Sequence, residues 1–363
     1  MALAAHDLLL RCSEDDMHQR GKLYVAMLQC KLQSIKYAQS LLSRRDGTPD
    51  DETRGMNQGE LDCLLLITTL QSLLETVSDT NGGWMTHLLG GLLLLRQHGE
   101  SPFTPAVHRF ATDHLSLYEV FLSSTGVKVG VEPLDGWLVV QRQAVSPILR
   151  SKHGRSQINP CTGISSELVT IIACITAALR HDVGFEPTRP RDLTFEGLQE
   201  ELQYLEERLT SLTQWSEDPD QDSIICLNAA AFETAAWVYL RLAQAPAHDA
   251  QIQSELIPKL LNCIEKIHER QGDLLGSLPY PMWALFIAAC AAPEDERART
   301  LDCFSQLTHA CSSSNILSVS DAVMHIWKQR DMGLVGVYTA KRVTALSWQG
   351  MIQDLKLKAA FIV

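Results

Sequence analysis

Glu233 is the acidic side chain that most needs an explanation, because it lies in the otherwise apolar run of residues 227–237. A helix would place small residues and one tryptophan beside it, namely Ala229, Ala230, Ala236 and Trp237. Burying a carboxylate among apolar groups requires a partner or a purpose. Two interpretations stay open. Either Glu233 is a catalytic group on a cavity wall that Trp237 also lines, or the alanines simply let two helices pack closely.

His87 is the second candidate for a catalytic role. In a helix it shares a face with Trp84 and Gly91. An imidazole can exchange a proton near neutral pH, but single buried histidines more often make a structural hydrogen bond. We therefore expect a structural bond at His87, with catalysis as the alternative. Trp84 is a candidate ligand contact.

No familiar catalytic motif accompanies these residues. The sequence contains no Gly-x-Ser-x-Gly, no Walker loop and no His-Glu-x-x-His. The acidic residues 218–222 resemble the start of a calcium loop, but Ser223 and Ala229 stand where glycine and a bidentate glutamate are needed. We predict neither a metal nor a cofactor.

Charge and hydropathy exclude several classes of partner. The formal net charge is -12, and the basic residues form no cluster that would neutralise phosphates. We therefore predict no direct binding of nucleic acid and no attraction to anionic lipid. The longest apolar runs fall short of the roughly 20 residues that cross a membrane.

The ten cysteines and the first residues indicate where the protein works. No Cys-x-x-Cys pair occurs, and most cysteines lie in apolar helical stretches, as free thiols in a reducing compartment do. The N-terminus has no basic segment ahead of its short apolar run, so a secretion signal is not expected. We predict an intracellular protein of the cytoplasm or nucleus.

Hydrophobic periodicity predicts an all-α, multi-helix single domain over residues 1–363. Helices are expected at 23–42, 61–77, 84–98, 168–179, 198–215, 223–242, 256–268, 282–291, 297–310 and 318–327. A further helix opens after Pro102 and is ended by residues 123–126, and residues 163–167 form the start of the helix that contains 168–179. Loops near 46–59, 127–160 and 183–193 separate helical subsections, and the second loop is where a short strand fits best. Gly99 suits a left-handed helix cap.

Three segments together resemble one family, the regulatory (middle homology) domain of fungal binuclear-zinc-cluster transcription factors. Residues 84–99 are similar to its Trp-x-x-His-Leu-x-Gly-x-x-x-Leu-Leu-x-x-x-Gly helix. Residues 160–165 are similar to Pro-x-x-Gly-Ile-Ser. Residues 283–289 are similar to Trp-Pro-Leu-Phe-x-x-Gly, with Ala284 and Ala289 in place of proline and glycine.

The resemblance implies a helical regulatory domain in which Trp283 and Phe286 belong to a ligand-facing element. Plain core packing of these two aromatic residues is the alternative. Family members normally begin with six closely spaced cysteines that bind two zinc ions and read DNA. Here the closest cysteines, Cys303 and Cys311, are eight positions apart. The resemblance therefore implies a stand-alone regulatory domain.

Two functions from different classes are compatible with these observations. The first is a binding module whose internal pocket holds a hydrophobic small metabolite. The alternative is an enzyme: a cofactor-free cyclase of the Diels-Alderase or terpenoid cyclase type, in fungal secondary metabolism, that acts by holding reacting atoms close. A degenerate domain that serves only as a scaffold is a third possibility. A protein partner or a homodimer is left open, as is the choice between binding and catalysis.

Overall fold

The computed structural model describes residues 17–43, 56–78, 83–99, 102–124, 156–182, 195–217, 220, 223–244, 252–271, 280–311 and 314–332. The chain forms two compact units. Unit 1 comprises Met1–Ser116 with Cys311–Ser313, and unit 2 comprises Leu117–Ala310 with Ser314–Val363. Each unit is described below by itself.

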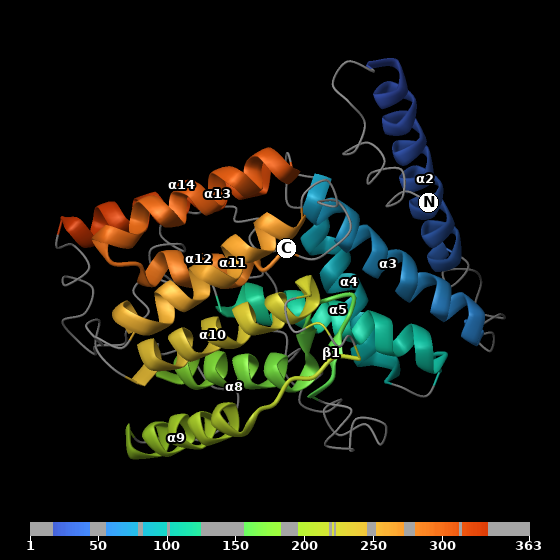
Figure 1. Cartoon of the computed structure of the whole chain (residues 1–363). Coiled ribbons are helices and arrows are strands. Elements are labelled where there is room, and N and C mark those ends of the chain that lie inside the picture. The colour runs from blue at the N-terminus through green and yellow to red at the C-terminus, as the bar shows by residue number, and fades with distance from the viewer. Residues whose placement is uncertain are drawn as a thin grey trace. The chain divides into compact units, whose positions relative to one another are not determined.

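Unit 1 is built on α2 (Met17–Ser43), α3 (Gln58–Ser78), α4 (Gly83–His98) and the first part of α5 (Pro105–Ser124). Helix α3 packs against both α2 and α4. Figure 1 shows α2 in dark blue and α3 and α4 in lighter blue. The buried apolar side chains of α3 and α4 are Leu61, Leu64, Leu65, Leu74, Trp84, Leu88, Leu92 and Leu95.

Local sequence signals set the ends of these helices. Asn57 and Glu60 form a reciprocal capping box: the Glu60 amide donates to Asn57 Oδ1 at 3.0 Å, and the Asn57 amide donates to Glu60 Oε2 at 3.1 Å. Gly99 ends α4 with a φ of +66°, and its amide donates to the Leu95 carbonyl at 3.0 Å. The predicted left-handed cap at Gly99 is confirmed.

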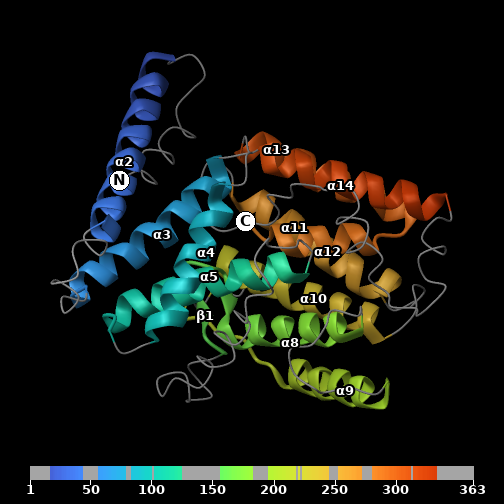
Figure 2. The same ribbon diagram turned by 180° about the vertical axis from the view of Figure 1, so that it is seen from behind.

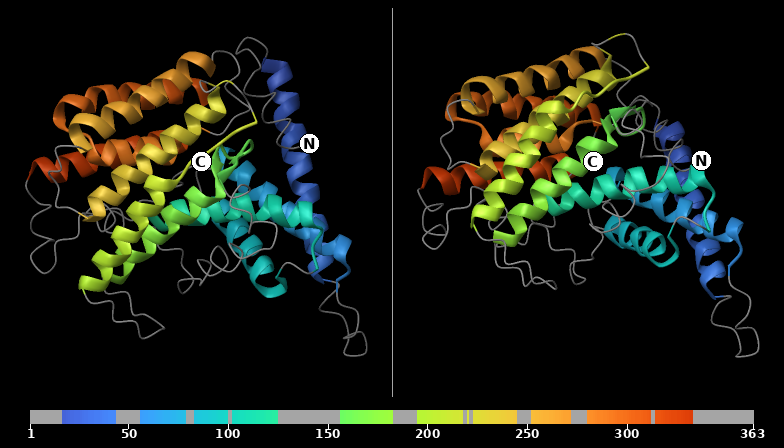
Figure 3. Two further views of the ribbon diagram at one scale, coloured as in Figure 1. Left: turned by 60° about the horizontal axis from the view of Figure 1, so that its bottom comes forward. Right: turned by 90° about the horizontal axis from the view of Figure 1, so that it is seen from below.

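Helix α10 (Ile224–Gln244) is the central element of unit 2. It packs against α8 (Ser166–Asp182), α9 (Phe195–Ser211), α11 (Ile257–Gln271) and α12 (Met282–Ala291). Figures 1 and 2 show α10 between α8 and α11 from opposite sides, and Figure 3 shows α8, α9 and α10 running side by side. Every residue of α12 is buried, as its wholly apolar sequence requires.

The remaining described parts of unit 2 are the end of α5, two short helical segments, two further helices and a small ribbon. A short π-helix (Ile252–Leu256) precedes α11, and a 3₁₀-helix (Glu294–Glu296) precedes α13 (Arg297–Cys311). Helix α14 (Ser314–Asp331) then packs on α12. The ribbon pairs β1 (Ile158–Asn159) with β2 (Ile164–Ser165) in antiparallel register.

The ribbon is closed by a turn at Gly163, whose φ is +67°. A side chain there would also meet Asn228 of α10, because an added Cβ would lie 3.0 Å from Asn228 Cβ. Ser165 caps α8: its Oγ accepts from the Leu168 amide at 3.3 Å.

The prediction of an all-α protein is confirmed for the part of the chain that the structure describes, where the ribbon is the exception. Its first strand lies within the predicted loop 127–160, and its second follows at Ile164–Ser165. Residues 44–55, 125–155 and 183–194, which hold most of the predicted loops, lie outside the described residues. The single domain stays a prediction. Within the described helices, none is long and apolar enough to cross a membrane.

Candidate ligand-binding site

Helix α3 carries a polar face that is turned away from solvent. Thr68, Gln71, Ser72 and Glu75 follow the i, i+3, i+4, i+7 spacing of one helix face. Gln71, Ser72 and Glu75 are all at least 96% buried, and Thr68 is half-buried. We call these four residues the α3 polar face. Polar groups removed from water need hydrogen-bond partners, so each atom of this face requires an account.

Part of the α3 polar face is satisfied within unit 1. One carboxylate oxygen, Glu75 Oε1, lies 2.5 Å from Lys31 Nζ on α2 and 3.4 Å from His87 Nε2 on α4. The Gln71 side-chain amide donates to the Lys31 carbonyl at 3.5 Å. Thr68 Oγ1 donates back to the Leu64 carbonyl of its own helix at 3.0 Å. Glu75 thereby connects three helices.

Two acceptor atoms of the same face are left over. Glu75 Oε2 and Gln71 Oε1 are buried and have no hydrogen-bond partner among the described residues. We call these two atoms the open acceptors. The hydroxyl of Ser72, which lies on the same face, likewise has no partner within the described part of the chain. A buried acceptor without a donor costs roughly 1–3 kcal/mol, and more when it is charged.

Electrostatics keeps Glu75 ionised despite its burial. Burial raises the pKa of the carboxyl group, but the bonds from His87 and Lys31 lower it by more, so the pKa of Glu75 lies below its usual value. At neutral pH the open acceptor on Glu75 is therefore a carboxylate oxygen. It would attract a hydrogen-bond donor or a cation.

The structure brings His87 of α4 to this face. His87 makes the predicted polar contact, and its partner is Glu75. Trp84, one turn earlier on α4, is fully buried. Gly91, on the same face of α4, packs so closely that an added Cβ would lie 2.7 Å from Leu115 Cδ1. Catalysis by His87 and ligand contact by Trp84 stay predictions.

Glu233, in unit 2, has a partner that the sequence did not indicate. The side-chain amide of Gln214 donates to Glu233 Oε2 and to the Ala229 carbonyl, at 3.1 Å each. Gln214 Oε1 in turn accepts from the Ser165 amide at 3.0 Å. Gln214 thus ties α10 to the ribbon, and this geometry favours a structural role for Glu233. Its catalytic role stays a prediction.

The predicted aromatic ligand contacts of unit 2 lie in or beside a dense ring cluster. Trp283 is fully buried and stacks on Phe121, with centroids 5.1 Å apart and planes 6° apart. Tyr239 meets the Trp283 ring edge-on at 5.9 Å, and the Trp283 indole N–H donates to Ser124 Oγ at 2.7 Å. These contacts favour core packing for Trp283.

Phe286 and Trp237 differ in their surroundings. Phe286 is fully buried in α12. Trp237 is half-buried, and the guanidinium of Arg241 lies 5.7 Å from the centre of its ring. Ligand contact at either residue stays a prediction.

The six candidate residues are divided between the two units. His87 and Trp84 belong to unit 1, whereas Glu233, Trp237, Trp283 and Phe286 belong to unit 2.

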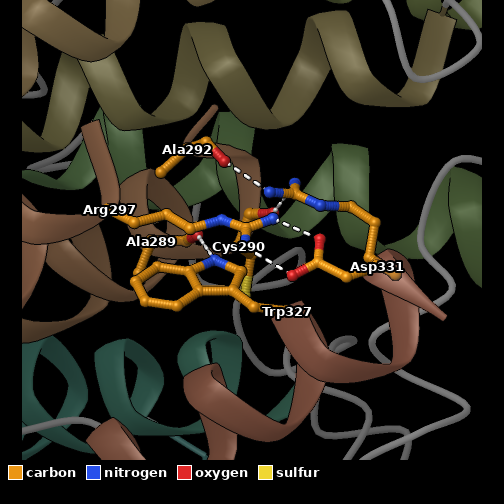
Figure 4. Close-up of polar contacts among 7 residues, drawn as sticks. Ala289, Cys290, Ala292, Arg297, Trp327 and Asp331 are labelled. Atoms are coloured by element: carbon orange, nitrogen blue, oxygen red, sulfur yellow. Dashed lines mark hydrogen bonds and ion pairs between the residues drawn. The ribbon is translucent and has the colours of Figure 1, made fainter. Parts of the chain in front are cut away.

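A cluster from α14 holds the end of α12, as Figure 4 shows. The Trp327 indole donates to the Ala289 carbonyl at 2.8 Å, and Arg330 donates to the carbonyls of Cys290 and Ala292 at 3.4 and 2.6 Å. The last carbonyls of a helix have no partner within it, so side chains must supply one when that end is buried. This cluster fixes the element that carries Trp283.

Comparison with known protein families finds a match over almost the whole chain. The model of the fungal specific transcription factor domain matches residues 1–361. No curated protein and no solved structure matches the chain significantly. Among the described residues, no group of three histidine, cysteine or acidic side chains is placed to hold a metal ion. The chain belongs to the family of fungal specific transcription factor domains.

Proposed function

We propose that this chain is a ligand-binding regulatory domain that holds a small organic molecule against the α3 polar face, beside His87 and Trp84. The observation that carries the proposal is the pair of open acceptors on Glu75 and Gln71. A bound molecule that donates hydrogen bonds to them would remove the cost of leaving them unmet. The family's regulatory role agrees with a domain that responds to such a molecule.

The site specifies the chemistry of the ligand at one end. Two acceptors and one hydroxyl favour a hydroxyl or amine group, because a carboxylate or ether would bring no donor. We expect the other end to be apolar, since the buried side chains of α3 and α4 include Trp84, Leu88 and Leu74. We therefore propose a hydrophobic metabolite that carries an alcohol or amine.

A cyclase that uses the same site is the alternative. The observation in its favour is the contact between His87 Nε2 and Glu75 Oε1, because a carboxylate beside an imidazole orients it for proton transfer. Glu233 would then be uninvolved. An enzyme would convert a linear polyene into an isomer of the same mass, whereas a regulatory domain would bind its ligand without converting it.

Matched probes test the proposal directly. Farnesol and 1-decanol, each compared with its methyl ether, keep the apolar body and differ in the donor. We expect both alcohols to raise the melting temperature of the full chain saturably, and to bind at least about tenfold more tightly than the ethers. Equal binding of alcohol and ether, or no binding of either alcohol, would contradict the proposal.

Variants assign the effect to the site. Glu75→Gln puts an amide donor where an acceptor is needed, so it should abolish the preference for alcohols. Glu207→Gln, at an exposed position of α9, is the matched control.

Mass spectrometry after incubation with a linear polyene separates the alternatives: a new isomer supports the cyclase.

A further inference from the structure

Helix α2 exposes an apolar stripe that is distinct from its contact with α3. Four large side chains of the stripe are strongly exposed: Val25 at 51%, Leu28 at 42%, Leu32 at 52% and Leu42 at 48%. Ile35, on the same stripe, is half-buried. Isolated apolar side chains at a surface are ordinary, but an aligned series on one helix face marks an interaction site.

The spacing of the stripe is that of a coiled coil. Residues 25, 28, 32, 35, 39 and 42 alternate steps of three and four, which is the a/d pattern of two and a half heptads. We call these six positions the α2 seam. Five of them are apolar, and the sixth is the exposed Gln39 at an a position. A single polar a residue is compatible with a coiled coil, because it fixes the register of pairing at some cost in stability.

The seam is separate from the face of α2 that is already covered. The face that packs against α3 includes the buried Met27 and Leu41, which are not seam positions. Residues 25–42 extend about 27 Å along the helix, at roughly 1.5 Å per residue. The seam is therefore long enough for a second helix to lie along it while α3 keeps its own contact.

The charge of α2 indicates what would cover the seam. The helix contains Arg20, Lys22, Lys31 and Lys36 and no acidic residue, although the whole chain has a net charge of -12. Lys22 and Lys36 are exposed and flank the seam at e positions. Charges at e and g decide which helices pair, because they face the partner's flanks.

Pairing of two copies of α2 is disfavoured by these charges. In either orientation a second copy would bring only basic or neutral flanks toward Lys22 and Lys36, and like charges repel across such a seam. We propose that the α2 seam binds a helix of another protein with leucines at heptad positions and glutamates beside them. This interaction lies beyond the ligand site and does not depend on it.

A synthetic peptide tests the interaction. It has three heptads, with leucine at a and d and glutamate at e and g, and a fluorophore reports its anisotropy as the full chain is added. We expect saturable binding to the chain, and at least about tenfold weaker binding when lysine replaces glutamate in the peptide. No binding, or equal binding of both peptides, would overturn the proposal.

Variants of α2 locate the binding. Leu32→Gln should weaken binding of the acidic peptide at least about tenfold, and Lys36→Glu should weaken it severalfold. Tyr37→Gln is the matched control, because Tyr37 is 47% exposed but lies outside the seam. Unchanged circular dichroism shows that each variant is folded. Sedimentation supplies the remaining outcome: a dimer of the chain that Leu32→Gln dissociates would assign the seam to a second copy and overturn the proposal.

Discussion

Among the described residues, Glu75 is paired at only one of its two carboxylate oxygens. Its Oε1 is paired with Lys31 and His87, and its Oε2 is an open acceptor. A buried pair that loses one member leaves a charge without compensation, which is worse than losing both. The stability of unit 1 therefore depends on Lys31 as long as Glu75 is present.

Substitution of Lys31 tests this dependence. Lys31→Met should lower the free energy of unfolding by about 1–3 kcal/mol, because Glu75 then keeps only His87. Lys31→Met combined with Glu75→Leu should recover most of that loss. Urea unfolding of the two single variants and the double variant forms a cycle that isolates the coupling. Additive losses would show that the pair contributes nothing.

The importance of Glu75 was not predictable from the sequence. A polar stripe on an amphipathic helix ordinarily faces solvent, so no local pattern indicates that Gln71, Ser72 and Glu75 are buried. Glu233 was identified because it interrupts an apolar run, but its partner Gln214 is 19 residues away in the sequence. A contact between distant residues has no local signal, whereas an anomaly within one helix does.

Among the helices, the most reliable predictions rest on signals within the element itself. Helix α12 was predicted at its observed bounds because it is apolar on every side. Helix α3 begins at Gln58, inside the predicted loop, because the capping box at Asn57 and Glu60 precedes its apolar positions. The helix predicted to run to residue 215 ends at Ser211, since the backbone of Trp215 pairs with the ribbon instead.

Two neighbouring glycines of α4 give a matched test of helix packing. Gly91→Ala should destabilise the protein by about 1–3 kcal/mol, since the new Cβ would lie 2.7 Å from Leu115 Cδ1. Gly90→Ala should be neutral or slightly stabilising. Its nearest neighbour is Thr68 Cγ2 at 3.8 Å, and alanine favours a helix. Urea unfolding compares the two. Equal effects would contradict the close packing at Gly91.

The contacts that Arg330 of α14 makes with the end of α12 give a second test at the scale of an element. Arg330→Met removes the donors to the carbonyls of Cys290 and Ala292, so the free energy of unfolding should fall by about 1–3 kcal/mol. Asp331→Asn weakens the ion pair with Arg297 at an exposed carboxylate, and its effect should be much smaller. Thermal unfolding ranks the two variants. A larger loss of stability for Asp331→Asn than for Arg330→Met would show that the bonds from Arg330 do not stabilise the end of α12.

At the scale of the whole molecule, stability should fall on mild acidification because of one buried and one half-buried histidine, His114 in unit 1 and His268 in unit 2. Burial lowers the pKa of His114 in α5 and of His268 in α11 below the usual 6.5, with partial opposition from a bond to the Phe110 carbonyl and from Glu265, respectively. His268 Nε2 also lies 2.5 Å from the hydroxyl of Tyr280. Both rings are held in their neutral form.

Linkage sets the direction and the pH range of the effect. A histidine whose pKa is lower in the folded chain takes up its proton first in the unfolded chain, so unfolding becomes easier as the pH drops below 6.5. The urea midpoint should therefore be lower at pH 5.5 than at pH 7.5. Glu75 acts in a separate window below 4.5, where its carboxylate begins to be protonated in the unfolded chain.

Substitution separates the contribution of the two histidines to the pH dependence from that of the surface charge. His114→Gln and His268→Gln should each reduce the difference between the midpoints at pH 7.5 and 5.5, because a glutamine takes up no proton. His98→Gln, at an exposed position of α4, should leave it unchanged. If all three variants kept the full difference, the acid sensitivity would arise from the net charge of the chain. Buried imidazoles would then have no part in it.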